Sequence, residues 1–314
     1  MSSDDAARWR FHDDAAAFLD AAADHLAAHP VATTVVLTVA DELRRLPPPP
    51  VAWPRWYAVG YDEAGQVAGV AMRTSETPPH APYVAPMPPE LAAGLGAALA
   101  RRGEQARGLN GEVVAARACA QALADATGGR GSVEVGMTQR LYEHRDVAAL
   151  GTADGVPGRW RRAAEADLPL LRAWLTDFHP AAARQAGRPP AAHGSGPAMR
   201  EESLRDRVDS GRLRLWEVDG EPVSLAGTTA VLHGVGRVGP VYTPGPLRGR
   251  GYAAAATAAA TRSLLDAGAR PCLFADAANP TSNALYERLG YVAIGDFAEL
   301  RIEAVPGVTT PAPA

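Results

Sequence analysis

The strand and helix patterns of this chain run through the same order twice. Each half contains a helix, a β-hairpin, a strand, one or more further helices and a closing strand. Strands that alternate with helices form sheets covered by helices. The repeated order therefore predicts a mixed α/β fold built from two similar modules in tandem, although the two halves share few identical residues.

The patterns of the first half are those of a small α/β module. Residues 31–46 are ambiguous, because TTVVLTV favours a strand and ADELRRL favours a helix. The other predicted elements are a helix over 13–28, a hairpin over 55–74 that turns at 62–65, a short strand over 83–87, helices over 90–102 and 112–127, and a strand over 132–143.

The second half repeats this plan with stronger signals. Residues 180–197 are rich in Ala, Gly, Pro and Arg, which predicts a mobile loop. The predicted elements are a strand over 159–163, helices over 164–179 and 199–209, a hairpin over 212–232, a strand over 236–243, a helix that ends at Ala267, a strand over 271–277, a helix over 280–289 and a strand over 291–302.

The weakest patterning along the chain predicts the domain boundary. Residues 146–158 form the predicted linker between an N-terminal domain, 1–145, and a C-terminal domain, 159–306. Residues 307–314 are expected to be a flexible tail.

Composition excludes several functional classes. The net charge is −4 and the pI is about 6.1, so we expect no nucleic-acid partner. Cys119 and Cys272 lie far apart, which argues against a disulfide framework or a metal site. The polar N-terminus and the lack of a long apolar run predict a cytoplasmic protein without a membrane partner. The sequence leaves open whether it is a monomer or a homodimer.

The stretch YTPGPLRGRGYAAAA, residues 242–256, lies between a predicted strand and a predicted helix. A helix N-terminus has unpaired N–H groups that attract phosphate oxygens, and glycines allow a ligand close to the backbone. Arg248 and Arg250 add charged donors. The sequence therefore predicts a pyrophosphate cradle at Arg248, Gly249, Arg250, Gly251, Tyr252 and Ala253. The chain has no lysine, so the stretch is not a Walker loop.

The order Arg-x-x-Gly-x-Ala, from Arg248 to Ala253, resembles the acetyl-coenzyme A signature of the GCN5-related N-acetyltransferase (GNAT) superfamily. A second stretch, NPTSNALYERLGY at 279–291, is similar to the superfamily's other coenzyme segment. The resemblance covers about residues 159–303. It implies a GNAT fold, acetyl-CoA as co-substrate and no metal, and a small-molecule or peptide amine as acceptor, but it does not identify the acceptor.

The resemblance also implies residue roles. Tyr286 matches the tyrosine that protonates the departing thiolate, and Asn283 would bond the pantetheine arm or orient Tyr286. Asn279 belongs to the same helix face by its spacing and is counted with the coenzyme-binding residues. Backbone N–H groups near Val241, Tyr242 and Thr243 would polarise the thioester carbonyl.

The general base is left open. The strand before the cradle offers Arg237 and no carboxylate, which leaves Glu217, His233, Asp276 or a water. The alternative function is a non-catalytic module that binds acyl-CoA. In the first half, Pro88 and Pro89 occupy the place of the cradle and lack N–H donors, so we expect that half to have lost the coenzyme.

Overall fold

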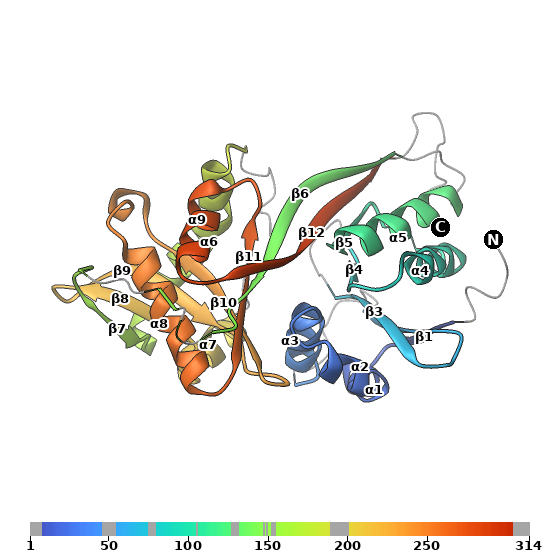
Figure 1. The fold of residues 1–314 in the computed structure, drawn as a ribbon, viewed down its shortest axis with the longest axis horizontal. Coiled ribbons are helices and arrows are strands. Elements are labelled where there is room, and N and C mark those ends of the chain that lie inside the picture. Colours follow the sequence, from blue (N-terminus) through green and yellow to red (C-terminus); the bar gives the residue numbers. More distant parts are fainter. Residues whose placement is uncertain are drawn as a thin grey trace. The chain divides into compact units, whose positions relative to one another are not determined.

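The computed structural model describes residues 8–45, 55–74, 80–104, 106–126, 132–146, 148, 150–151, 155–188 and 201–303. The predicted tail, 307–314, lies outside the described residues, as do 189–197 of the predicted loop and five positions of the predicted linker. The chain forms two compact units (Figure 1). One contains Met1–Thr138 and Asp296–Ala314, and the other contains Gln139–Gly295.

The first unit has a sheet in the order β1-β2-β3-β4-β5-β12, with helices packed against it. Its elements are β1 Trp9–His12, α1 Ala15–Ala21, α2 Ala23–Ala28, α3 Thr34–Leu43, β2 Trp56–Tyr61, β3 Val67–Arg73, β4 Tyr83–Val84, α4 Pro89–Arg101, β5 Gly108–Glu112, α5 Val113–Ala126, and parts of β6 Ser132–Glu143 and β12 Val292–Glu303.

Three features of this unit differ from the sequence prediction. The predicted helix over 13–28 is two helices that meet at Ala22, and the ambiguous segment 31–46 contains helix α3. The strands β1 and β5 were not predicted. The sequence of β5, GLNGE, has no strand propensity, and its pairing with β12 and β4 makes it a strand.

The second unit has the sheet order β6-β11-β10-β9-β8-β7. Its elements are the end of β6, β7 Arg159–Arg162, the 3₁₀ helix η2 Glu165–Asp167, α6 Leu168–Gln185, α7 Glu201–Asp209, β8 Leu213–Val218, β9 Glu221–Thr228, β10 Val235–Tyr242, the 3₁₀ helix η3 Gly245–Leu247, α8 Tyr252–Asp266, β11 Arg270–Asp276, α9 Pro280–Arg288 and the start of β12.

Helices cover both faces of this second sheet. Leu171 and Trp174 of α6 pack with Leu215 and Tyr242 on one face. Small alanines of α8 pack with Ala226, Val238 and Leu273 on the other, so α8 lies close to the sheet as the alanine run predicts. The prediction of a loop over 180–197 is wrong for its first residues. Helix α6 continues to Gln185 and buries Ala181 and Ala183.

The two halves of the chain show the repeated element order in three dimensions. The series β1–α3, β2–β3–β4, α4–β5–α5–β6 is followed by β7–α7, β8–β9–β10, α8–β11–α9–β12. Each closing strand contributes residues to the unit of the other half. Gln139–Glu143 of β6 pairs with β11, and Phe297–Arg301 of β12 pairs with β5. Each half of the sequence therefore gives part of its closing strand to the unit that the other half forms. The compact units meet at residues 138–139 and 295–296, and not at the predicted linker 146–158.

Candidate functional site

The two central strands of the second unit separate at their carboxyl ends. Val235–Arg237 of β10 pairs in parallel with Arg270–Cys272 of β11. Farther along, β10 pairs with β9 through an irregular register between Val238 and Val241, and β11 pairs with β6. In the described sheet, Val238–Tyr242 has no ladder partner on the β11 side. Because successive residues direct their backbone groups to opposite neighbours, either Val241 or Tyr242 presents its N–H to this opening.

The predicted cradle follows directly after this opening. Gly249 and Gly251 adopt φ values of 77° and 82°, and Gly251 is the N-cap of α8. Within the described chain, the six consecutive amides from Gly249 to Ala254 donate no hydrogen bond to the protein, whereas the amide of Ala255 donates to the Gly251 carbonyl. Backbone N–H donors without a partner at a helix N-terminus can bind an anion such as a phosphate group.

Two residues shape the cradle from within the unit. The Nε of Arg248 donates to the Thr243 carbonyl at 2.9 Å, which holds the end of β10 against the loop. Val156 lies under Gly251, where an added Cβ would come within 2.8 Å of the valine Cγ2. Gly251 is therefore required both for its φ and for its close approach to Val156. Arg250 is exposed, and the side chain of Tyr252 is buried.

The second coenzyme-like segment forms α9 as predicted. The side chain of Asn279 caps the helix by accepting from the Ser282 amide at 3.2 Å, and Pro280 is the first helical residue. The Asn283 amide group donates to the carbonyls of Asp276 and Ala277, each at 3.1 Å. Both asparagines therefore fix the turn between β11 and α9, and their contact with a coenzyme stays a prediction.

Tyr286 lies on the same helix, one turn beyond Asn283. Its ring centroid is 6.2 Å from those of Tyr142 and Tyr291. Burial, with a smaller contribution from Tyr142, raises the pKa of Tyr286 to about 12. No hydrogen bond from a described residue occupies its hydroxyl group. The phenol is thus protonated at neutral pH and free to donate to a ligand.

Tyr142 is a site residue that the sequence prediction missed. Its hydroxyl donates to the Asn283 Oδ1 at 3.1 Å and lies 3.4 Å from the Glu287 Oε1. It comes from the end of β6, which the predicted boundaries assign to the N-terminal domain. Only the exchanged pairing of β6 with β11 shows that it belongs beside Tyr286.

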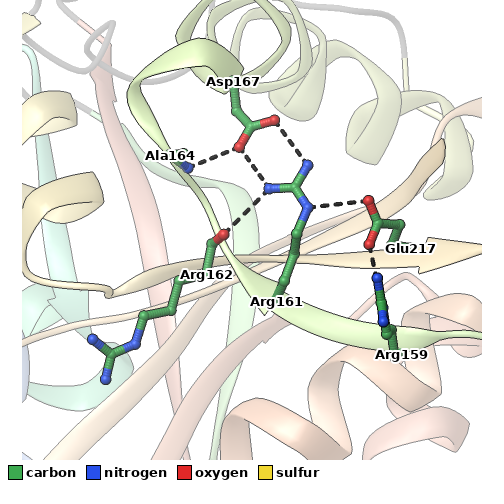
Figure 2. A network of polar contacts seen from close by, with 6 residues as sticks. All are labelled: Arg159, Arg161, Arg162, Ala164, Asp167 and Glu217. Atoms are coloured by element: carbon green, nitrogen blue, oxygen red, sulfur yellow. Dashed lines mark hydrogen bonds and ion pairs between the residues drawn. The ribbon is translucent and has the colours of Figure 1, made fainter. Parts of the chain in front are cut away.

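Glu217, a candidate base, is held in a network of charges (Figure 2). Arg161 donates to Glu217 at 3.2 Å and to both carboxylate oxygens of Asp167, at 2.7 and 3.0 Å. Arg159 adds a longer ion pair with Glu217 at 3.6 Å. The Arg161 guanidinium holds the pKa of Asp167 below its usual value. This network ties β7, β8 and η2 together, so its contacts assign Glu217 to structure.

The other two candidate bases have different surroundings. Asp276 lies at the end of β11, where it pairs with Arg188 and accepts from the Ala278 amide at 3.0 Å. Its carboxylate is 10% exposed. His233 is exposed in the turn between β9 and β10, at the opposite end of β10 from the cradle. Of the three, only Asp276 lies at the open ends of the strands.

A further carboxylate lies next to the end of β10. The Tyr242 hydroxyl donates to the Asp177 Oδ2 at 2.6 Å, and Arg184 donates to the Asp177 Oδ1 at 3.0 Å. The Tyr242 bond is the main cause that lowers the pKa of Asp177, while burial and Asp177 raise the pKa of Tyr242 to about 12. No separate sequence signal marks Asp177, which lies in an ordinary amphipathic helix.

Comparisons with known proteins bear on the fold. Residues 218–302 match the family model described as FR47-like protein. A GNAT-family acetyltransferase from Colwellia psychrerythraea is 12% identical, with a TM-score of 0.55, and the match covers 95% of this chain and 99% of the other. A GCN5-related N-acetyltransferase from Sphaerobacter thermophilus is 16% identical, with a TM-score of 0.54 and coverage of 96% and 98%.

The chain has a GNAT fold. The resemblance to this superfamily predicted from the sequence is thereby confirmed at the level of fold. The solved structure of a Drosophila protein matches with a TM-score of 0.60 at 14% identity, covering 96% of this chain and 99% of that one. No curated protein matches the chain.

The described residues contain no group of three or more His, Cys, Asp or Glu side chains placed to hold a metal ion. None of the described helices combines the length and the apolar composition that crossing a membrane requires.

Proposed function

We propose that this GNAT-fold protein is an acyl-CoA-dependent N-acyltransferase that transfers acetyl from acetyl-CoA to an amine. The observation that carries the proposal is the row of six amides, Gly249–Ala254, that donate to no described residue and lie at the open ends of β10 and β11. Such a row suits the pyrophosphate of the coenzyme. The opening between the strands gives the pantetheine arm a path to the unpaired end of β10.

The proposed chemistry uses residues around this opening. An N–H of Val241 or Tyr242 stabilises the oxygen that becomes negative when the amine attacks the thioester carbonyl. Tyr286 gives its proton to the sulfur as the carbon–sulfur bond breaks. The attacking nitrogen loses a proton to a water or to Asp276, which is the candidate carboxylate at the open ends of the strands and would have to leave its ion pair with Arg188 to accept the proton.

We also propose that the chain is a tandem of two GNAT-like modules, of which only the second binds the coenzyme. Helix α4 of the first half begins at Pro89 with Pro88 as its N-cap, so two of the donors that a cradle needs are missing. The repeated element order supports the tandem arrangement.

The alternative is a module that binds acyl-CoA without turnover. Incubation of the full chain with acetyl-CoA and panels of small amines, amino acids and peptides, read by thiol release, separates the two. The enzyme releases coenzyme A above the rate without acceptor for at least one panel. A chain that binds acetyl-CoA and releases none with any panel is the binding module.

A further inference from the structure

Two arginines on neighbouring strands of the second unit have no carboxylate partner among the described residues, unlike the arginines beside them. Arg162 of β7 lies directly opposite Arg214 of β8 in the antiparallel register. Within the described chain, neither guanidinium forms an ion pair or a hydrogen bond with another side chain. By contrast, Arg161 pairs with Asp167 and Glu217, and Arg212 pairs with Asp206.

This like-charged pair is on the other face of the strands from the Glu217 network. Side chains alternate along a strand, so Arg159 and Arg161 face one side, and Trp160 and Arg162 face the other. Figure 2 shows the Arg162 guanidinium directed away from the network that Arg161 forms. Like charges directly opposite each other in a sheet destabilise it. An anion bound between them would reduce this repulsion.

The Arg214 guanidinium is held in place but is not satisfied. Its Cζ lies 3.9 Å from the centre of the Trp160 ring, as in a cation–π contact. Its Nε and Nη1 are buried and have no hydrogen-bond partner in the described part of the chain. Burial and the charge of Arg162 lower the pKa of Arg214. Buried N–H donors without a partner lower the stability of the folded protein, because they have lost their hydrogen bonds to water. A ligand oxygen that accepts from them would restore these bonds.

Arg162 is held close to its backbone neighbours. Its Cδ lies 3.0 Å from the position that a Cβ on Gly211 would occupy, so the glycine leaves room for the arginine stem. Gly211 also has a φ of 67°. The Nε and Cζ of Arg162 lie 3.0 and 3.2 Å from the same position, so one side of the guanidinium packs against Gly211, while the side chain as a whole stays exposed to solvent.

We propose that Arg162, Arg214 and Trp160 form a binding site for a dianionic phosphate group, separate from the cradle at Gly249–Ala254. Two arginines that lie directly opposite each other in the strand register match the charge of a phosphate, which carries nearly two negative charges at neutral pH. A single carboxylate would leave one positive charge uncompensated. The side chains of Trp160 and Arg162 are exposed, so they can shift to admit phosphate oxygens to the Arg214 donors.

The test follows the Nε–Hε resonance of Arg214 in the full chain as inorganic phosphate is added, with the resonance assigned by Arg214→Gln. Sodium chloride at matched ionic strength controls for screening. We expect a saturable shift with phosphate only, at least tenfold weaker in Arg162→Gln and unchanged in Arg159→Gln. Arg159 is the matched control, because it lies on the same strand and faces Glu217.

The outcomes separate cleanly. The proposal is overturned by no saturable shift, by an equal shift in Arg162→Gln, or by acetate binding as tightly as phosphate. Coenzyme A and dephospho-coenzyme A distinguish the source of the phosphate. If the Arg214 resonance shifts with coenzyme A but not with dephospho-coenzyme A, the site exists and its occupant is the phosphate monoester of the coenzyme. If the two coenzymes shift the resonance equally and inorganic phosphate binds, the occupant is a separate phosphate ligand.

Discussion

Arg248 donates from its Nε to the carbonyl of Thr243 at 2.9 Å, and so connects the cradle to the end of strand β10. The residue that the sequence predicts as a phosphate ligand is therefore also a support for the loop. Its terminal guanidinium nitrogens form no hydrogen bond with a described residue, so they stay available for a ligand. The two roles can be separated by mutation.

Arg248→Ala should weaken acetyl-CoA binding more than Arg250→Ala does. Both variants remove one positive charge near the cradle, but only the first also frees the Thr243 carbonyl. Losing a charged hydrogen bond costs about 1.5–3 kcal/mol, so we expect a loss of at least tenfold in affinity for Arg248→Ala. Calorimetry on both folded variants measures it. Equal losses would mean that charge alone matters.

Gly251→Ala should destabilise the protein more than Gly249→Ala does. Both glycines have φ near +80°, where a side chain costs about 1–2 kcal/mol. A Cβ on Gly251 also meets Val156, whereas one on Gly249 meets nothing within 4 Å. The double variant Gly251→Ala, Val156→Ala should recover part of the difference in thermal unfolding. Additive effects in this cycle would refute the contact.

Arg161→Met should cost on the order of 2 kcal/mol of folding free energy at pH 7, since it leaves two largely buried carboxylates with less compensation. Asp167 has a folded pKa below its ordinary value of 3.8. Its contribution is therefore present above that value and is lost as the pH falls through the folded pKa.

The deficit of Arg161→Met should accordingly shrink below about pH 4. Denaturant unfolding of both proteins from pH 7 to pH 3 measures it. Arg162→Met is the matched control, because Arg162 has no carboxylate partner among the described residues and should show no such pH dependence. A deficit that is constant with pH would contradict the assigned role of the network.

Tyr286→Phe should lower turnover by roughly 10²–10⁴, the usual contribution of a positioned acid, while the affinity for acetyl-CoA changes little. Because the pKa of Tyr286 is about 12, loss of its proton should not limit the rate below pH 11. Steady-state kinetics on an acceptor found by thiol release measures this. Wild-type turnover with chemistry rate-limiting would remove Tyr286 as the acid and direct attention to Asp276 or water.

Local patterns predicted most elements but not the exchanged strands. The strand 132–143 and the helix at 280–288 were predicted nearly to the residue, because alternation and capping residues are local signals. The short strand β5 and the placement of Tyr142 beside Tyr286 depend on pairing between residues far apart in the chain. Similarly, Asp177 becomes notable only because α6 places it against Tyr242.

The central claim is that the second unit binds acetyl-CoA through the amides of Gly249–Ala254. A crystal structure of the full chain with acetyl-CoA tests it most directly. We predict one coenzyme per chain, with pyrophosphate oxygens within hydrogen-bond distance of these amides and the thioester beside Val241 and Tyr242. A coenzyme seated against Pro88 and Pro89, or none bound at millimolar acetyl-CoA, would contradict the account.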